Sequence, residues 1–112
     1  MIDLTLFEYM KAALAPTQLL MAIPPDPPKK FVYMEKTGSG EENRLKNATF
    51  AFQSYGGTVF EAAALNEEVK VAAAGAVALP EITKVKLNTD YNFADTQRKR
   101  PRYQAVFDIW HY

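Results

Sequence analysis

The fold of this chain is decided by the stretch Arg100-Pro101-Arg102-Tyr103-Gln104-Ala105-Val106-Phe107-Asp108-Ile109-Trp110-His111-Tyr112. A basic turn around a proline leads into a segment rich in aromatic and β-branched residues, which favour strands. Every second residue from 103 to 109 is apolar, and this period of two is typical of a strand with one buried face. The sequence therefore predicts a strand over residues 103–110, whose buried side chains are Tyr103, Ala105, Phe107 and Ile109.

Three earlier segments have the same strand character. They cover residues 31–36, 48–55 and 82–89. Gly38-Ser39-Gly40 is expected to end the first as a flexible turn rather than a phosphate-binding loop, and the polar residues 41–46 to form a long hairpin connection. The buried faces are expected to hold Ala48, Phe50 and Phe52 in the second of these strands, and Thr83, Val85 and Leu87 in the third.

Two segments have the patterns of amphipathic helices. Residues 3–15 are expected to begin at Asp3 as N-cap and to bury Leu4, Phe7, Met10 and Leu14. The second helix has the clearer start, because Thr58-Val59-Phe60-Glu61 has the spacing of a capping box and follows Gly56-Gly57. Between the first helix and the first strand lie a short apolar stretch and four prolines, at positions 24, 25, 27 and 28. The prolines predict a stiff connection in preference to a recognition segment.

These elements follow the order helix, strand, strand, helix, strand, strand. Strands with alternating apolar and polar residues need one covered face. We therefore predict an α+β fold with a mainly antiparallel four-stranded sheet and both helices packed on one face.

The composition is that of a globular protein, with 112 residues of which 48% are hydrophobic. We expect a single domain over residues 1–112, because this length supports one hydrophobic core. The absence of cysteine excludes disulfides and thiolate metal sites. The only histidine, His111, lacks partner residues at metal-binding spacing, so we expect no metal and no cofactor.

The 13 basic and 13 acidic side chains cancel, so the overall charge does not draw the chain to nucleic acid or to a membrane surface. The longest apolar run, residues 71–79, is far shorter than the roughly 20 residues that a membrane-spanning helix needs. Asp3 and Glu8 near the start do not fit a signal peptide. We therefore expect no membrane partner.

Four blocks of the sequence resemble the tail-terminator proteins of long-tailed bacteriophages, which are also called tail-completion or head-to-tail joining proteins. The first is Pro27-Pro28-Lys29-Lys30-Phe31-Val32-Tyr33-Met34-Glu35-Lys36-Thr37-Gly38, and the second is Phe50-Ala51-Phe52-Gln53-Ser54-Tyr55 with the helix that follows it. The third is a strand with a polar loop, and the fourth is Pro101-Arg102-Tyr103-Gln104-Ala105. Together the blocks span most of the chain.

The resemblance implies a structural role without catalysis. Such proteins assemble as a ring, commonly of six subunits, on the head-proximal end of the tail tube. There they stop tube polymerisation and present a surface to the capsid connector. The implied partners are other copies of the chain, the tail tube protein and the capsid connector proteins, with DNA only as it passes through the ring lumen. The isolated subunit can be a monomer, and the implied location is the head–tail junction of the virion, or the host cytoplasm during assembly.

Three exposed segments are the candidate interaction surfaces. The basic segment consists of Arg98, Lys99, Arg100 and Arg102. It either lines a lumen that passes DNA, meets an acidic neighbour or is a solvated loop, and its few charges favour the solvated loop. Trp110 falls on the strand face opposite Phe107 and Ile109, so either that face is covered or an aromatic patch meets a partner. The candidate residues are Gly38, Ser39, Gly40 and Arg44, then Arg98, Lys99, Arg100 and Arg102, and finally Trp110 and Tyr112. We expect reversal of Arg100 and Arg102 to glutamate to leave folding intact while impairing junction formation.

Two other classes of protein stay open. One is a connector adaptor or stopper protein of the same junction, for which a helix-rich composition would be expected in the adaptor case. The other is a small enzyme, which would need a cleft with convergent ionisable groups. The sequence offers a single histidine and no paired carboxylates, so we expect no enzymatic activity.

Overall fold

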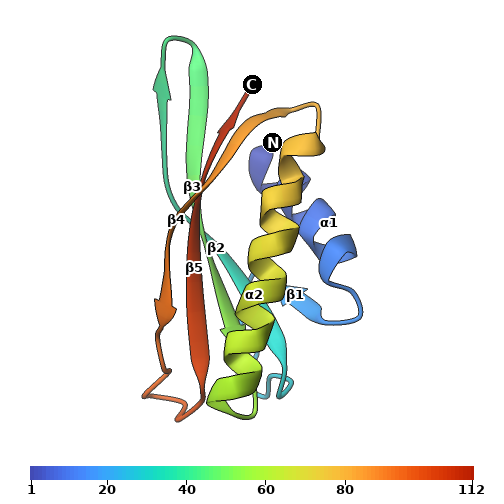
Figure 1. Ribbon diagram of the computed structural model, residues 1–112, viewed down its shortest axis with the longest axis vertical. Helices are drawn as coiled ribbons and strands as arrows, with labels where there is room; N and C mark the ends of the chain where they lie inside the picture. Colours follow the sequence, from blue (N-terminus) through green and yellow to red (C-terminus); the bar gives the residue numbers. More distant parts are fainter.

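A computed structural model describes all 112 residues of the chain (Figure 1). One layer is a five-stranded sheet, and the other consists of two helices that pack on the same face of that sheet. In chain order the elements are α1 (Ile2–Leu14), β1 (Gln18–Leu20), β2 (Phe31–Glu42), β3 (Leu45–Tyr55), α2 (Val59–Gly75), a 3-10 turn (Ala76–Ala78), β4 (Ile82–Asn92) and β5 (Arg102–His111). The predicted α+β class and the placement of both helices on one face are confirmed. Neither helix is long and apolar enough to span a membrane.

The strands are ordered β1-β2-β3-β5-β4, and all neighbours are antiparallel except β1 and β2. The predicted four-stranded sheet is therefore wrong by one strand, and the sheet is mixed. The extra strand forms because Leu19 reaches the core beside Val32, its register partner on β2. Residues 21–30, which include the four prolines, carry the chain back so that β2 runs parallel to β1.

The core lies between the helices and one face of the sheet. Phe52 and Phe107 pack there in a T-shaped, edge-to-face arrangement, with ring centroids 6.2 Å apart. Tyr9 of α1 links the two helices, because its hydroxyl donates a hydrogen bond to the Ala72 carbonyl of α2 at 2.8 Å. The other fully buried members include Leu6 and Met10 from α1, Leu65 and Val69 from α2, and Val32, Phe50 and Ile109 from the sheet.

The start of α1 differs from the prediction. The helix begins at Ile2, and its N-cap is Met1, which provides no side-chain hydrogen bond. Asp3 lies inside the first turn instead and pairs with Lys36 of β2 at 3.0 Å. The contact with Lys36 thus occupies the carboxylate that was expected to cap the helix. The buried face runs through Leu6, Met10 and Leu14, which pack in the core, and Leu4 is 56% exposed.

The start of α2 is as predicted. Thr58 is the N-cap, and its side chain accepts a hydrogen bond from the Glu61 amide at 3.1 Å. Gly56 allows the chain to pass close to this first turn, since a Cβ there would lie 2.6 Å from the Ala62 amide nitrogen. The position therefore requires glycine.

In the hairpin between β2 and β3 the strands are longer and the turn is shorter than predicted. Gly38, Ser39 and Gly40 lie within β2, because pairing with β3 overrides their weak strand preference, and only Asn43 and Arg44 form the turn. Both turn residues have left-handed backbone conformations, with φ of 53° and 66°, as a two-residue hairpin turn of the primed type requires. The predicted long connection over residues 41–46 is thus wrong.

Strand β4 lies at the edge of the sheet and does not follow the predicted alternation. Its register with β5 shifts between Ile82 and Lys84 and again between Leu87 and Thr89. The first shift takes Thr83 out of the alternation, and Thr83 is exposed although it was expected inside. Val85 and Leu87 stay on the helix side of the sheet, paired with Ile109 and Phe107, but at this edge Val85 is only half-buried and Leu87 is exposed. β4 also extends to Asn92, so the loop to β5 covers only residues 93–101.

Replacing Phe52 by alanine is expected to lower the free energy of unfolding by about 3–5 kcal/mol, because the ring is fully buried and its removal leaves a cavity. Phe60→Ala is the matched control, since Phe60 is 82% exposed and should change stability by no more than about 0.5 kcal/mol. Urea denaturation measures both values. Equal effects of the two substitutions would contradict this placement of the core.

Candidate functional site

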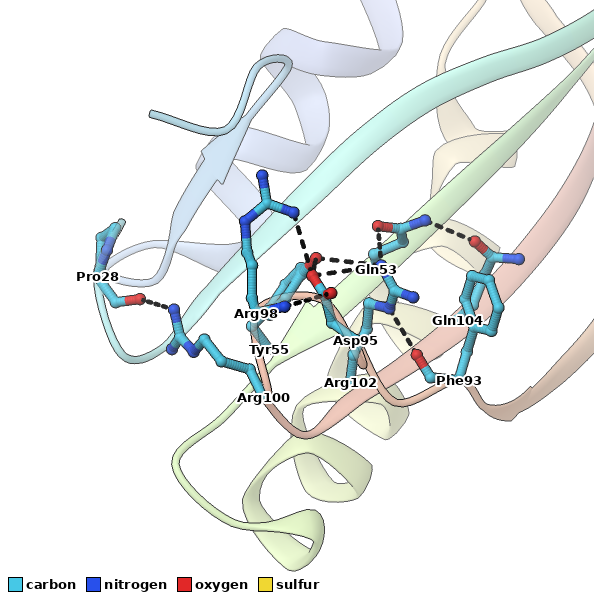
Figure 2. Close-up of polar contacts among 9 residues, drawn as sticks. All are labelled: Pro28, Gln53, Tyr55, Phe93, Asp95, Arg98, Arg100, Arg102 and Gln104. Carbon is cyan, nitrogen blue, oxygen red and sulfur yellow. Dashed lines mark hydrogen bonds and ion pairs between the residues drawn. The ribbon is translucent and has the colours of Figure 1, made fainter. Parts of the chain in front are cut away.

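The β4–β5 loop, residues 93–101, folds back onto the sheet around the buried carboxylate of Asp95 (Figure 2). Asp95 is 4% exposed. Its Oδ2 accepts a hydrogen bond from the Tyr55 hydroxyl at 2.8 Å and from Arg98 Nη1 at 3.1 Å, and its Oδ1 accepts one from the Arg98 amide at 3.0 Å. Arg102 Nη1 lies 3.7 Å from Oδ2. Both oxygens of the carboxylate thus accept hydrogen bonds, and Oδ2 also faces the positive charge of Arg102.

These contacts change two pKa values. Burial by itself raises the pKa of Asp95, but the hydrogen bonds from Arg98 and Tyr55 and the charge of Arg102 outweigh it and lower that pKa to about 2. Burial also raises the pKa of the Tyr55 hydroxyl, and the bond that it donates to Asp95 raises it further. At neutral pH the pair is therefore a neutral tyrosine bound to a charged aspartate.

Arg102 extends this network across the open face, the sheet surface opposite the helices. Its Nη1 donates to Gln53 Oε1 at 3.3 Å and to the Tyr55 hydroxyl at 3.2 Å, and its Nε donates to the Phe93 carbonyl. The guanidinium also lies over the Phe93 ring, 4.1 Å from the centroid. Gln53 in turn donates to Gln104 at 2.9 Å, so the network reaches β5.

Arg100 connects the same loop to the proline-rich segment. Its Nη1 donates to the Pro28 carbonyl at 2.9 Å (Figure 2). Its Nη2 donates to the Lys29 carbonyl. The guanidinium lies 5.5 Å from the rings of Phe31 and Tyr55, which stack on each other with centroids 4.4 Å apart. Segments some 70 positions apart in the sequence are therefore joined through one side chain.

The basic segment (Arg98, Lys99, Arg100 and Arg102) is therefore held mainly by contacts within the chain and is not a solvated loop. Three of its four members make contacts within the chain, and Lys99 has none, at a left-handed backbone position with φ of 55°. The expectation that Arg100 and Arg102 can both be reversed to glutamate without loss of folding is wrong on this geometry. A glutamate at position 102 would place a second carboxylate against Asp95.

The other candidate residues lie at the opposite end of the sheet. In one row of the register Gly40, Asn47, Trp110 and Lys84 are side by side, eight residues along β3 from the row that contains Tyr55 and Arg102. Trp110 is half-buried on the open face, where the Lys84 ammonium lies 4.9 Å from its ring centroid. Tyr112 is 78% exposed. Gly38, Ser39, Gly40 and Arg44 are exposed along the hairpin.

An apolar groove of about 470 Å³ lies between α2 and the edge strand β4 and was not predicted. Val71 is 76% exposed and Leu87 is 37% exposed at its rim. The sequence contains a short signal for it, because the apolar residues Val71 and Ala74 lie three positions apart on the exposed side of α2. The remaining lining residues are Glu67, Lys70, Val85 and Phe107.

No group of three or more histidine, cysteine, aspartate or glutamate side chains could hold a metal ion. His111 is 8% exposed, and its Nδ1 lies 3.0 Å from the Tyr112 carbonyl. The fold brings polar side chains together in the Asp95 network and in a smaller cluster in which Asn66 and Lys70 both donate to Asp90.

The fold matches a chain of the virion of a native gene transfer agent particle. The two share a TM-score of 0.65 and 15% sequence identity, and the match covers 91% of this chain and 83% of that chain. Neither models of known protein families nor curated protein sequences give a match. The likeness defines the class of fold, an α+β domain also found in a particle of that kind.

Asp95→Asn is expected to lower the free energy of unfolding at neutral pH by roughly 2 kcal/mol, because it removes a carboxylate whose pKa falls from 3.8 to about 2 on folding. A depressed folded pKa stabilises the protein above the unfolded pKa, and this contribution is lost as the pH falls from about 4 to about 2. Denaturation of wild type across this range should show the loss, and Asp95→Asn should lack it.

Asp26→Asn is the control, since Asp26 is exposed in the proline-rich segment. Its pH profile should match that of wild type. If Asp95→Asn also followed the wild-type profile, the carboxylate would not be held by the contacts described above.

Proposed function

We propose that this chain is a virion structural protein that forms a ring on the head-proximal end of a phage-like tail tube, stops tube growth and joins the tail to the capsid connector. The observation that carries this proposal is the fold likeness to a chain of a gene transfer agent virion over 91% of the residues. The four sequence blocks that resemble tail-terminator proteins support the specific role. A connector adaptor or stopper protein of the same junction is the alternative, and it shares the virion location.

The free edge of β4 supports assembly into a ring. A heterologous ring needs two different patches on each subunit, and an unpaired strand edge is a ready surface for a neighbour. The apolar groove adjoins this edge, with Val71 on one side and Leu87 on the other. Exposed apolar side chains that gather beside a groove, such as Val71 and Ala74 of α2, are typical of a surface that a partner covers. We assign this covering to a second copy of the chain.

The mechanism needs no chemical step. Ring closure covers the surface on which another tube subunit would add, and the opposite side of the ring receives the connector. The polar side chains serve this role by holding the loops in place, because Asp95 pairs with Arg98 and Arg102, while Arg100 and Arg102 also donate to backbone carbonyls. We expect no enzymatic turnover.

Negative-stain microscopy of the protein mixed with bare tail tubes of the same particle tests the role. The protein should appear at one end of each tube and should prevent further elongation when tube protein is added. Binding along the sides of the tubes, or no binding, would exclude the terminator role.

The double variant Val71→Glu and Leu87→Glu tests the neighbour surface. Both residues are exposed in the isolated subunit, so the free energy of unfolding should change by no more than about 0.5 kcal/mol for each, while ring formation and tube capping are lost. Leu4→Glu, on the exposed side of α1, is the control and should still cap tubes. Capping by the double variant would remove the groove from the mechanism.

A further inference from the structure

We infer that the proline-rich segment and the β4–β5 loop together form a binding surface for the phosphate backbone of duplex DNA. We call this the composite basic surface and define it as residues 24–30 and 93–102. The inference rests on the proposed function, because a ring at this junction has DNA in its lumen. It goes further by assigning that contact to a surface built from two segments that are distant in the sequence.

The charge of the chain is strongly segregated toward this end. The composite basic surface contains six of the 13 basic residues and two of the 13 acidic residues, which gives it a formal charge of +4 and leaves −4 on the rest of the chain. One of its two acids, Asp95, is buried and bound to arginine side chains. The other, Asp26, is exposed. Although the net charge of the chain is zero, this surface therefore carries a concentrated positive charge.

Arg100 brings the two segments together. By donating to the carbonyls of Pro28 and Lys29, it holds the proline-rich segment against the loop that carries Arg98 and Lys99. Prolines stiffen their own segment, so the lysines that follow them are presented at a fixed place. The result is a preformed surface rather than two flexible tails.

The cations on this surface are available to a ligand. Lys29, Lys30 and Lys99 are exposed and take part in no ion pair. The side chain of Arg98 is 44% exposed, although one of its nitrogens binds Asp95. Arg100 and Arg102 are occupied by internal contacts and serve to position the others.

The character of this surface fits a polyanion better than a protein. The centres of protein interfaces are apolar and depleted of lysine, whereas here three exposed lysines dominate. Lysine is a flexible, hydrated point charge and suits phosphates without reading sequence. A duplex presents closely spaced negative charges, so several lysines can be neutralised at once.

Fluorescence anisotropy with a labelled duplex of mixed sequence tests the inference on the full chain. Binding should be measurable at about 50 mM salt and should weaken roughly 40-fold at about 200 mM, as three phosphate contacts predict. The affinity should be the same for a second duplex of unrelated sequence. Absence of salt-dependent binding at about 50 mM would overturn the inference.

Charge reversal at the surface provides the decisive comparison. The triple variant Lys29→Glu, Lys30→Glu and Lys99→Glu should bind at least tenfold more weakly and lose most of the salt dependence. The control variant, Lys11→Glu, Lys46→Glu and Lys86→Glu, changes the net charge equally at exposed positions elsewhere and should bind within about threefold of wild type. Equal losses in both variants would show attraction to net charge only and would overturn the inference.

Two further readouts separate the possible outcomes. Polyglutamate of matched charge should compete poorly with the duplex, and equal competition would identify an acidic protein as the partner instead. Tube capping by microscopy requires no DNA, so the triple variant should still cap tubes. A triple variant that binds DNA normally would refute this inference alone, whereas a wild-type protein that fails to cap tubes would refute the proposed function.

Discussion

The structure depends on one buried negative charge. A carboxylate removed from water must be compensated by donors and positive charges, and Asp95 obtains them from β3, from its own loop and from β5. This requirement closes the β4–β5 loop over the end of the sheet and orients Arg102 along the open face. Arg100, held in the same loop, then fixes the proline-rich segment. Two surface segments thus take their positions from an electrostatic constraint and not from apolar packing.

The two faces of the sheet are stabilised differently. The helix-covered face is held by apolar burial around Phe50 and Phe52, which involves no titrating group and is not screened by salt as ion pairs are. The open face is held by polar pairs, such as Thr49 with Asp108 at 2.8 Å and Gln53 with Gln104 at 2.9 Å. A neighbouring subunit that covered the open face would meet polar side chains that are already hydrogen-bonded to one another, so these side chains would add little binding free energy. The apolar groove beside β4 offers more to a partner, which is why we place subunit contact there.

The elements with strong local signals were predicted correctly from the sequence. The predictions were wrong where long-range contacts determine the structure. The N-cap of α2 follows from capping chemistry and is confirmed. The period of two correctly places Ala105, Phe107 and Ile109 in the core, but Tyr103 is only half-buried. In the 48–55 strand the predicted residues are buried, but the alternation ends at Phe50, because residues 50–55 are buried on both faces. The fifth strand was missed because three residues carry too little local signal, and their pairing depends on β2. The internal roles of Arg100 and Arg102 could not be predicted. Arg100 donates to backbone carbonyls some 70 positions away, which any residue could supply, and Arg102 meets Gln53 and Tyr55 only because β3 and β5 pair.

Two adjacent glycines that look equivalent in the sequence are constrained to different degrees. At Gly56 an added Cβ would lie 2.6 Å from the Ala62 amide nitrogen, so no other amino acid fits at this site without moving the backbone. At Gly57 the nearest atom to an added Cβ is the flexible Glu61 carboxylate at 3.5 Å, and the position is free to drift. Among distant homologues of this fold, the first of the two glycines should therefore persist long after the second has been replaced.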